Sequence, residues 1–335
     1  MKKGITKILS ACVFAFVVFL AAGTQSKAAV NMGVKQTGAG SSYVNLAWDA
    51  QLGAGHYHTQ FSQDGKNWID MDNSSSPSES VYNLTQGASY YARVVAYKDS
   101  HYMGTHVMVG VSETAIVSTK PAEVSGLTQT AAGVNSVSMS WNASAGAASY
   151  VIYGYINYNW TQIGTSATNS ATITGVAATT STRFSVAAVK NVTGGTVTGD
   201  QCSGVEMKAI PIKVSRIAMQ YYWDSLKEAK YIWTDVNNAD GYQYEVKSAN
   251  GKKTYFRATS TSSYTYVKPF PRGIFVKARV RAYVTVGNKV YYGAWSPYTY
   301  HASSKKVTAK RSSNGKKIYL KWKKVSGASG YQVYV

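Results

Sequence analysis

The chain has 335 residues, of which 13% are aromatic and only 15% are charged, with 27 Tyr and 6 Pro. This composition excludes a disordered chain and favours β-sheet, and the length accommodates two or three average domains. Only two cysteines are present, so the fold cannot depend on a network of disulfides and must rest on hydrophobic cores.

Residues 1–29 have the pattern of a signal peptide. Lys2, Lys3 and Lys7 precede the apolar run Ile8–Ala22, and Ser26–Ala29 offers small residues for cleavage. The apolar run is shorter than the ~20 residues that a membrane-spanning helix needs. We therefore expect a secreted, extracellular chain with no membrane span after cleavage, and an uncleaved anchor is the alternative.

The two cysteines bear on the same question. Leu9–Cys12 resembles a bacterial lipobox, but it opens the apolar run instead of following it, which argues against a lipid anchor on Cys12. After cleavage only Cys202 remains, so no internal disulfide can form. Such a chain is compatible with a bacterial cell surface.

One motif recurs four times along the chain. A strand with a marker tryptophan is followed by a small-residue turn and a tyrosine strand, most clearly in Val137–Tyr153. The strands alternate apolar and polar residues with period two, which indicates half-buried antiparallel strands. Successive markers lie 93, 92 and 89 residues apart, a period that indicates tandem copies of one domain. The markers are Trp48, Trp141, Trp233 and Trp322.

The motif of Trp, then Gly-Ala-x-x-Tyr, then a strand such as Arg93–Ala96 resembles a fibronectin type III domain of secreted bacterial proteins. The resemblance implies an all-β chain of tandem immunoglobulin-like β-sandwiches, three complete and a fourth truncated. The predicted boundaries are 30–120, 121–210, 211–304 and 305–335. The chain stops inside the fourth copy, which we interpret as a fragment of a longer protein.

Local signals refine the copies. Asp64-Gly65 and Asn250-Gly251 predict hairpin turns, the first of type I′. Leu84 and Tyr90 resemble the tyrosine corner of these sandwiches, whereas the second and third copies lack that tyrosine.

Charge divides the chain sharply. Residues 31–210 carry 8 basic and 10 acidic residues, whereas residues 211–335 carry 23 basic and 5 acidic ones. Alternate positions of one strand hold three cations, with Ala278 and Val280 facing the core. One interpretation of these cations is a solvated face without a ligand. The other is a surface that attracts an anionic cell-wall polymer or polysaccharide. The ligand-binding candidates are Lys277, Arg279, Arg281, Tyr291 and Tyr298.

Sequence signals for catalytic, cofactor or metal sites are weak. No phosphate loop, paired-cysteine motif or carboxylate pair stands out, so we expect no enzyme, no cofactor and no metal. Histidines of the first domain leave a zinc or copper site as an alternative. Extra aromatics in the second and third domains could stack on sugars or fill sheet edges. These histidines are His56, His58, His101 and His106; the aromatics include Tyr153, Tyr155, Tyr158, Trp160, Tyr221 and Tyr222.

Together these patterns predict a non-catalytic extracellular spacer and adhesion array that contacts surface proteins or glycans at the bacterial cell envelope. Its location makes nucleic acid an unexpected partner. The alternative is the N-terminal accessory region of a longer secreted hydrolase whose catalytic domain follows residue 335.

Overall fold

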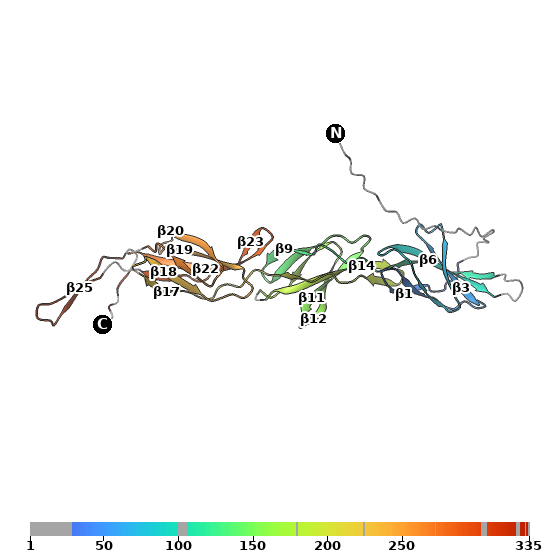
Figure 1. The fold of residues 1–335 in the computed structure, drawn as a ribbon, viewed down its shortest axis with the longest axis horizontal. Helices are drawn as coiled ribbons and strands as arrows, with labels where there is room; N and C mark the ends of the chain where they lie inside the picture. The colour runs from blue at the N-terminus through green and yellow to red at the C-terminus, as the bar shows by residue number, and fades with distance from the viewer. Residues whose placement is uncertain are drawn as a thin grey trace, which may run out of the picture. The chain divides into compact units, whose positions relative to one another are not determined.

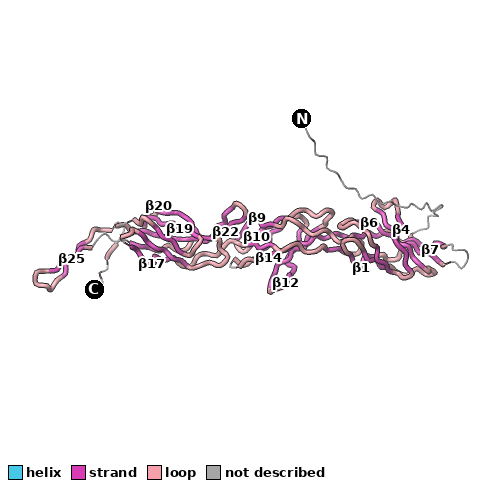
Figure 2. The backbone as a smooth tube through the Cα atoms, in the orientation of Figure 1, coloured by secondary structure: helices cyan, strands magenta, loops and turns pink. Residues whose placement is uncertain are grey.

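The computed structural model describes residues 29–99, 106–178, 180–223, 225–271, 273–302, 307–325, 329–331 and 333. These residues form the strands β1–β26 and no helix (Figure 2). Accordingly, nothing in these ranges is a helix of the length and apolarity needed to cross a membrane. The predicted all-β class is confirmed. The signal peptide and the lipobox fall on residues outside these ranges and stay predictions.

The first eight strands form two antiparallel sheets, ordered β1-β2-β5 and β4-β3-β6-β7, with β8 also paired to β6. Their bounds are β1 (Lys35–Ala39), β2 (Val44–Ala47), β3 (His56–Ser62), β4 (Ile69–Ser74), β5 (Ser78–Val81), β6 (Ser89–Lys98), β7 (Val107–Val111) and β8 (Ala115–Ser118).

The next eight strands repeat this arrangement as β13-β10-β9 and β12-β11-β14-β15, with β16 paired to β14. Figure 1 labels β9, β11, β12 and β14 of this set. Their bounds are β9 (Thr128–Gly133), β10 (Ser136–Ser140), β11 (Ser149–Ile156), β12 (Asn159–Ser166), β13 (Ser170–Thr174), β14 (Thr182–Val192), β15 (Gly195–Thr198) and β16 (Val205–Met207).

A third set has the order β17-β18-β21 and β20-β19-β22-β23, with β24 paired to β22. Its bounds are β17 (Ile217–Trp223), β18 (Glu228–Trp233), β19 (Gly241–Ser248), β20 (Thr254–Ser260), β21 (Tyr264–Val267), β22 (Phe275–Val286), β23 (Lys289–Tyr292) and β24 (Thr299–Ala302). One topology thus occurs three times, as a tandem array of immunoglobulin-like domains requires.

The fourth copy contributes a single hairpin within the described residues. β25 (Thr308–Arg311) pairs with β26 (Ile318–Lys321), and every residue of both strands is exposed. The domain boundaries proposed from the sequence stay predictions, although the strand sets follow the repeats.

The second and third strand sets each have their own hydrophobic core, formed by residues from both sheets of the set. Val137 and Met139 of β10 and Ile152 of β11 are at most 1% exposed and share a cluster with Val186 of β14. Burying such a side chain contributes about 1.5–3 kcal/mol. The alternation predicted for Val137–Tyr153 is the origin of this core, because every second side chain faces inward.

The repeated motif owes its form to a contact between its tryptophan and its tyrosine. Trp48, Trp141 and Trp233 are only 5%, 3% and 7% exposed, which confirms their predicted burial. Each packs on the motif tyrosine with ring centroids 5.3–5.5 Å apart, and so does Trp322. The tyrosine hydroxyl accepts a backbone N–H from six residues earlier, which closes the turn. The N–H···O pairs are Gln51 to Tyr57, Ser144 to Tyr150, Val236 to Tyr242 and Val325 to Tyr331.

The last strand of each sandwich is broken at one equivalent residue, which is Ser112, Cys202 or Ser296. Its side chain accepts a backbone N–H from the neighbouring strand, and its own N–H donates back to the same residue. The break therefore keeps its hydrogen bonds although the ladder is interrupted. It also explains the one cysteine among the described residues, which takes the place of a serine.

The predicted type I′ turn at Asp64-Gly65 is wrong. Type I′ requires positive φ at both central residues, but only Gly65 has it, at 72°. The Asp64 carboxylate instead accepts the N–H groups of Lys66 and Asn67, both at 2.8 Å, and shapes a longer loop between β3 and β4. The expected corner is present, because the Thr85 N–H donates to the Tyr90 hydroxyl at 3.0 Å.

Two compact units can be distinguished. One contains the described parts of Met1–Val34 together with Ala47–Glu79 and Tyr91–Ala115, and therefore most of β3, β4, β6 and β7. The other contains Lys35–Leu46, Ser80–Tyr90 and Ile116–Val335, within which the second and third strand sets lie. The first unit carries His56, His58 and His106, and the second carries the basic strand.

Candidate functional site

The predicted basic strand is β22, the central strand of its sheet. Lys277, Arg279 and Arg281 are half-buried on its outer face, whereas Ala278 and Val280 are fully buried on its inner face. The alternation follows from the pleat of an antiparallel strand, which sends successive side chains to opposite faces.

A buried carboxylate lies at the centre of this face. Glu245 of β19 is directly opposite Arg279 of β22 and Arg257 of β20 in the strand register, and it is 0% exposed. Its oxygens accept hydrogen bonds from Arg257 and Arg279, both at 2.6 Å, and Lys247 lies 3.1 Å away. Three cations thus surround one anion, as a buried charge requires.

The environment of Glu245 sets its protonation. Burial alone raises the pKa of this carboxyl, but hydrogen bonds from Arg257, Lys247 and Arg279 outweigh burial and hold the pKa at about 2. Glu245 is therefore ionised at neutral pH, and it fixes the directions of the cations around it.

Aromatic rings alternate with the cations along β22 and form what we call the ladder. Its order is Tyr292, Arg281, Trp295, Arg279, Tyr298 and Lys277. Arg281 lies 3.8 Å from the Tyr292 ring and 4.4 Å from the Trp295 ring. Arg279 lies 4.3 Å from Trp295 and 4.8 Å from Tyr298, and Lys277 lies 4.6 Å from Tyr298. Each such contact at an exposed site contributes about 0.5–1 kcal/mol.

The broken last strand positions these rings. Gly293 and Ser296 donate their N–H groups to the carbonyls of Ala282 and Val280, both at 2.8 Å, so this segment follows β22 closely. Trp295 consequently lies between Arg279 and Arg281. Arg281 is further held by the Gln243 side chain at 2.6 Å.

The structure brings four of the five predicted residues together and separates the fifth. Lys277, Arg279, Arg281 and Tyr298 belong to the ladder. Tyr291, by contrast, pairs with the buried Val284 and so points to the opposite side of the sheet. The sequence-based prediction missed Tyr292, Trp295 and Glu245. Period-two alternation along β23 could have selected Tyr292 over Tyr291, but no sequence signal pairs Glu245 with Arg279.

The other sheet of the third domain carries an exposed aromatic face. Trp223, Tyr264 and Tyr266 are 46%, 43% and 46% exposed, and Trp223 packs against Tyr221 at 4.4 Å between ring centroids. The amino group of Lys230 lies 5.0 Å from the Tyr264 ring and 5.7 Å from the Tyr266 ring. A hydrogen bond with Tyr266 raises the pKa of Tyr221 to about 12.

The remaining predicted aromatics divide between face and core. Tyr222 packs inward against Phe270 and the core of the third domain. In the second domain, Tyr155 and Trp160 form an edge-to-face pair at 5.3 Å, and Tyr158 is 89% exposed at the tip of the β11–β12 hairpin. Tyr153 is half-buried on β11.

The histidines of the first domain also gather. His56 and His58 are half-buried on the outer face of β3, while Tyr57 and Thr59 face inward as predicted. His106 lies near them, and its ring centroid is 4.6 Å from that of His56. His101 is outside the described residues.

Comparison with known proteins does not show a family for this chain. Neither a family model nor a curated protein sequence matches the chain. Among solved structures, the FN1–FN3 domains of chicken CNTN1 are 15% identical, with a TM-score of 0.33 and coverage of 81% of this chain and 97% of that one. A similarity this low supports neither a fold nor a function for this chain. The fold assignment therefore rests on strand pairing and burial.

Proposed function

We propose that the chain is a non-catalytic spacer and adhesion array at the bacterial cell envelope, and that its third domain binds an anionic wall polymer or polysaccharide. The proposal rests on one observation, the ladder face. On this outer face of β19, β20 and β22, five basic side chains lie around the ladder, three of them in contact with the buried Glu245 carboxylate, which leaves a clear excess of positive charge. The five are Lys247, Arg257, Lys277, Arg279 and Arg281.

The cations of this face are fixed before any ligand arrives. Glu245, Gln243 and the ladder rings hold Arg279 and Arg281 in place. Binding therefore loses less side-chain entropy than it would with free lysines. Alternate residues of β22 repeat about every 6–7 Å, so the face presents a row of positive charge to a linear polyanion.

The aromatic face favours a second contact, with sugar rings. Trp223, Tyr264 and Tyr266 expose broad apolar surfaces around Lys230. Exposed aromatic groups of this kind mark ligand or protein contacts more often than random surface does. A charged polysaccharide could use either face of the third domain, and variants of each face separate the two.

The test is binding of the full chain to immobilised teichoic acid between about 0.05 and 0.5 M salt. Lys277→Gln combined with Arg281→Gln should weaken binding about tenfold and reduce its salt dependence, because surface charges are screened within about 10 Å at 0.1 M salt. Arg257 and Arg279 are left intact because both form ion pairs with the buried Glu245.

The matched control is Lys35→Gln combined with Lys66→Gln, which removes the same charge from exposed positions of the first domain. If binding falls equally in both double variants, then the overall charge of the chain, and not the ladder face, is responsible for binding. Binding that responds only to Tyr266→Ala would assign the contact to the aromatic face instead.

A further inference from the structure

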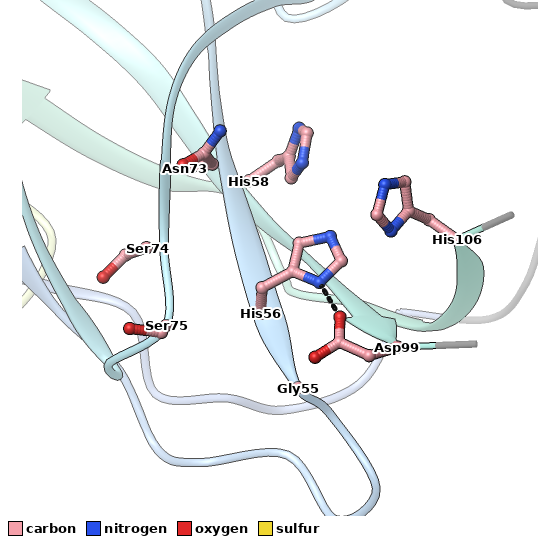
Figure 3. Close-up of a pocket in the computed structure, with 8 residues that line it drawn as sticks. All are labelled: Gly55, His56, His58, Asn73, Ser74, Ser75, Asp99 and His106. Atoms are coloured by element: carbon pink, nitrogen blue, oxygen red, sulfur yellow. Dashed lines mark hydrogen bonds and ion pairs between the residues drawn. The ribbon is translucent and has the colours of Figure 1, made fainter. Parts of the chain in front are cut away.

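A pocket of about 660 Å³ lies in the first compact unit, far in sequence from the ladder. Its lining includes His56 and His58 of β3, Asn73 of β4, Asp99 after β6 and His106 before β7 (Figure 3). Three histidines and a carboxylate at one opening are a chemically specific set, since imidazole nitrogens are the commonest metal ligands that proteins supply.

Strand register explains why these residues meet. His56 pairs with Tyr97 of β6, so Asp99, two residues further on, lies on the same face. Lys98 pairs with Val107 of β7, which puts His106 across from Asp99 at the end of the hairpin. Asp99 and His106 lie 43 and 50 positions after His56 in the sequence, and antiparallel strand pairing places both of them beside it.

The geometry is close to that of a metal site. One ligand atom from each of His56, Asp99 and His106 lies within 4.8 Å of the other two. The His56 Nδ1 is already 2.6 Å from the Asp99 Oδ1, and Figure 3 shows the three side chains pointing toward one another. Ligand atoms around a tetrahedral zinc ion are about 3.3 Å apart, given bonds of about 2.0 Å. Modest side-chain rotation would complete such a site.

The anchoring of the three residues suits this movement. The His56 ring stacks on Tyr97, with centroids 5.3 Å apart and an angle of 11° between the planes. Asp99 and His106 are exposed and can turn without disturbing a core. His58 lies next to His56, with ring centroids 5.4 Å apart, but it is not one of the three grouped ligands.

We propose that His56, Asp99 and His106 bind a divalent transition-metal ion of the zinc type, with a fourth position open to solvent. Two imidazoles and one carboxylate suit zinc, copper or nickel, whereas calcium and magnesium prefer oxygen ligands throughout. The ion ties β3 to the end of the β6–β7 hairpin. This proposal departs from the expectation, drawn from the sequence, of no metal site, and develops the zinc or copper alternative for these histidines.

The test is calorimetric titration of the full chain, purified without a polyhistidine tag, with zinc chloride. One ion per chain should bind, and magnesium should not compete. His106→Ala and Asp99→Asn should each weaken binding by at least about tenfold, since losing a ligand costs no less than losing an outer-shell partner. Cobalt should give the visible absorption of a tetrahedral complex, and this signal should vanish in His106→Ala.

Ser75→Ala is the matched control, because Ser75 lines the same pocket but is not among the grouped ligands. Its affinity should equal that of the unmodified chain. Unchanged melting temperatures of the metal-free variants would show that they fold. Equal zinc affinity in His106→Ala and the unmodified chain, or a loss seen only in His58→Ala, would overturn the proposed ligand set.

Discussion

The tyrosine of the repeated motif acts through its hydroxyl as well as its ring. In the second domain, the Tyr150 hydroxyl accepts the Ser144 N–H at 3.0 Å, and the ring packs on Trp141. Ring packing gives a hydrophobic contact that many residues could supply. The hydroxyl fixes where the chain turns, which explains why tyrosine instead of phenylalanine recurs in all four copies.

Tyr150→Phe should therefore lower the local free energy of unfolding by about 1 kcal/mol, since it removes one hydrogen bond and keeps the ring. Hydrogen exchange of the β11 amides measures this change within one domain of the full chain. Tyr153→Phe is the control, because Tyr153 faces outward on the same strand. Equal effects of the two substitutions would count against a specific role for the Tyr150 hydroxyl.

Glu245 couples the stability of the third domain to pH. Its pKa of about 2 lies below the value of about 4.3 expected in an unfolded chain. A lowered folded-state pKa gives stability that is complete above the unfolded value and lost as pH falls through the folded value. The melting temperature of this domain should thus fall between about pH 4.5 and pH 2.

Glu245→Gln should flatten that pH profile and cost about 3 kcal/mol at neutral pH, because three cations then lack their anion. Calorimetry of the full chain from pH 7 to pH 2 follows both effects. Glu206→Gln changes an exposed carboxylate and should leave the profile unaltered. An unchanged acid limb in Glu245→Gln would show that other carboxylates govern it.

At the scale of elements, the broken last strand is the device that the three domains share. Ser112, Cys202 and Ser296 each accept an N–H from the adjacent strand. In the third domain the segment around this break positions the ladder rings over β22. The break thus joins a backbone feature to the candidate binding face.

Cys202→Ser should be tolerated, with a change in unfolding free energy below about 1 kcal/mol. A serine hydroxyl can accept the Val186 N–H, as Ser112 and Ser296 accept the equivalent N–H groups in the other domains. Cys202→Ala should cost about 1–3 kcal/mol, since it leaves that buried N–H unpaired. Hydrogen exchange of β14 compares the two variants. If Cys202→Ser were less stable than Cys202→Ala, Cys202 would not be equivalent to the serines of the other domains.

The hairpin β25–β26 differs from every other described strand because all of its strand residues are exposed. Ile318, Tyr319 and Leu320 are 67%, 59% and 40% exposed. We expect limited proteolysis by trypsin or thermolysin to remove residues after about 304 first, while residues 30–302 persist. Mass spectrometry identifies the boundary. Protection of the hairpin under conditions that cleave the loops between sheets would contradict this.

At the scale of the whole molecule, two features concern the chain as a unit: the export predicted from residues 1–29, and the uneven charge. Basic residues are concentrated after residue 210, where 23 basic residues face 5 acidic ones. An exported array with a neutral first part and a basic later part would present the basic part to envelope polyanions.

Export has a direct test. The intact mass of the protein recovered from the medium or cell surface should correspond to a chain that begins at Val30, after cleavage following Ala29. A chain that retains its first residues would favour the uncleaved anchor. A lipid-modified chain beginning at Cys12 would instead favour the lipobox.

Local patterning by itself determined the strands, the tandem period and the buried tryptophans of this protein. Period-two alternation and the recurring Trp and Tyr depend on neighbours in sequence, so the pattern alone assigns Trp141 and Val280 to the core. Partners across strands depend on register, which one sequence does not specify. Tertiary structure alone therefore joined Glu245 to Arg257 and Arg279 and brought Asp99 beside His56.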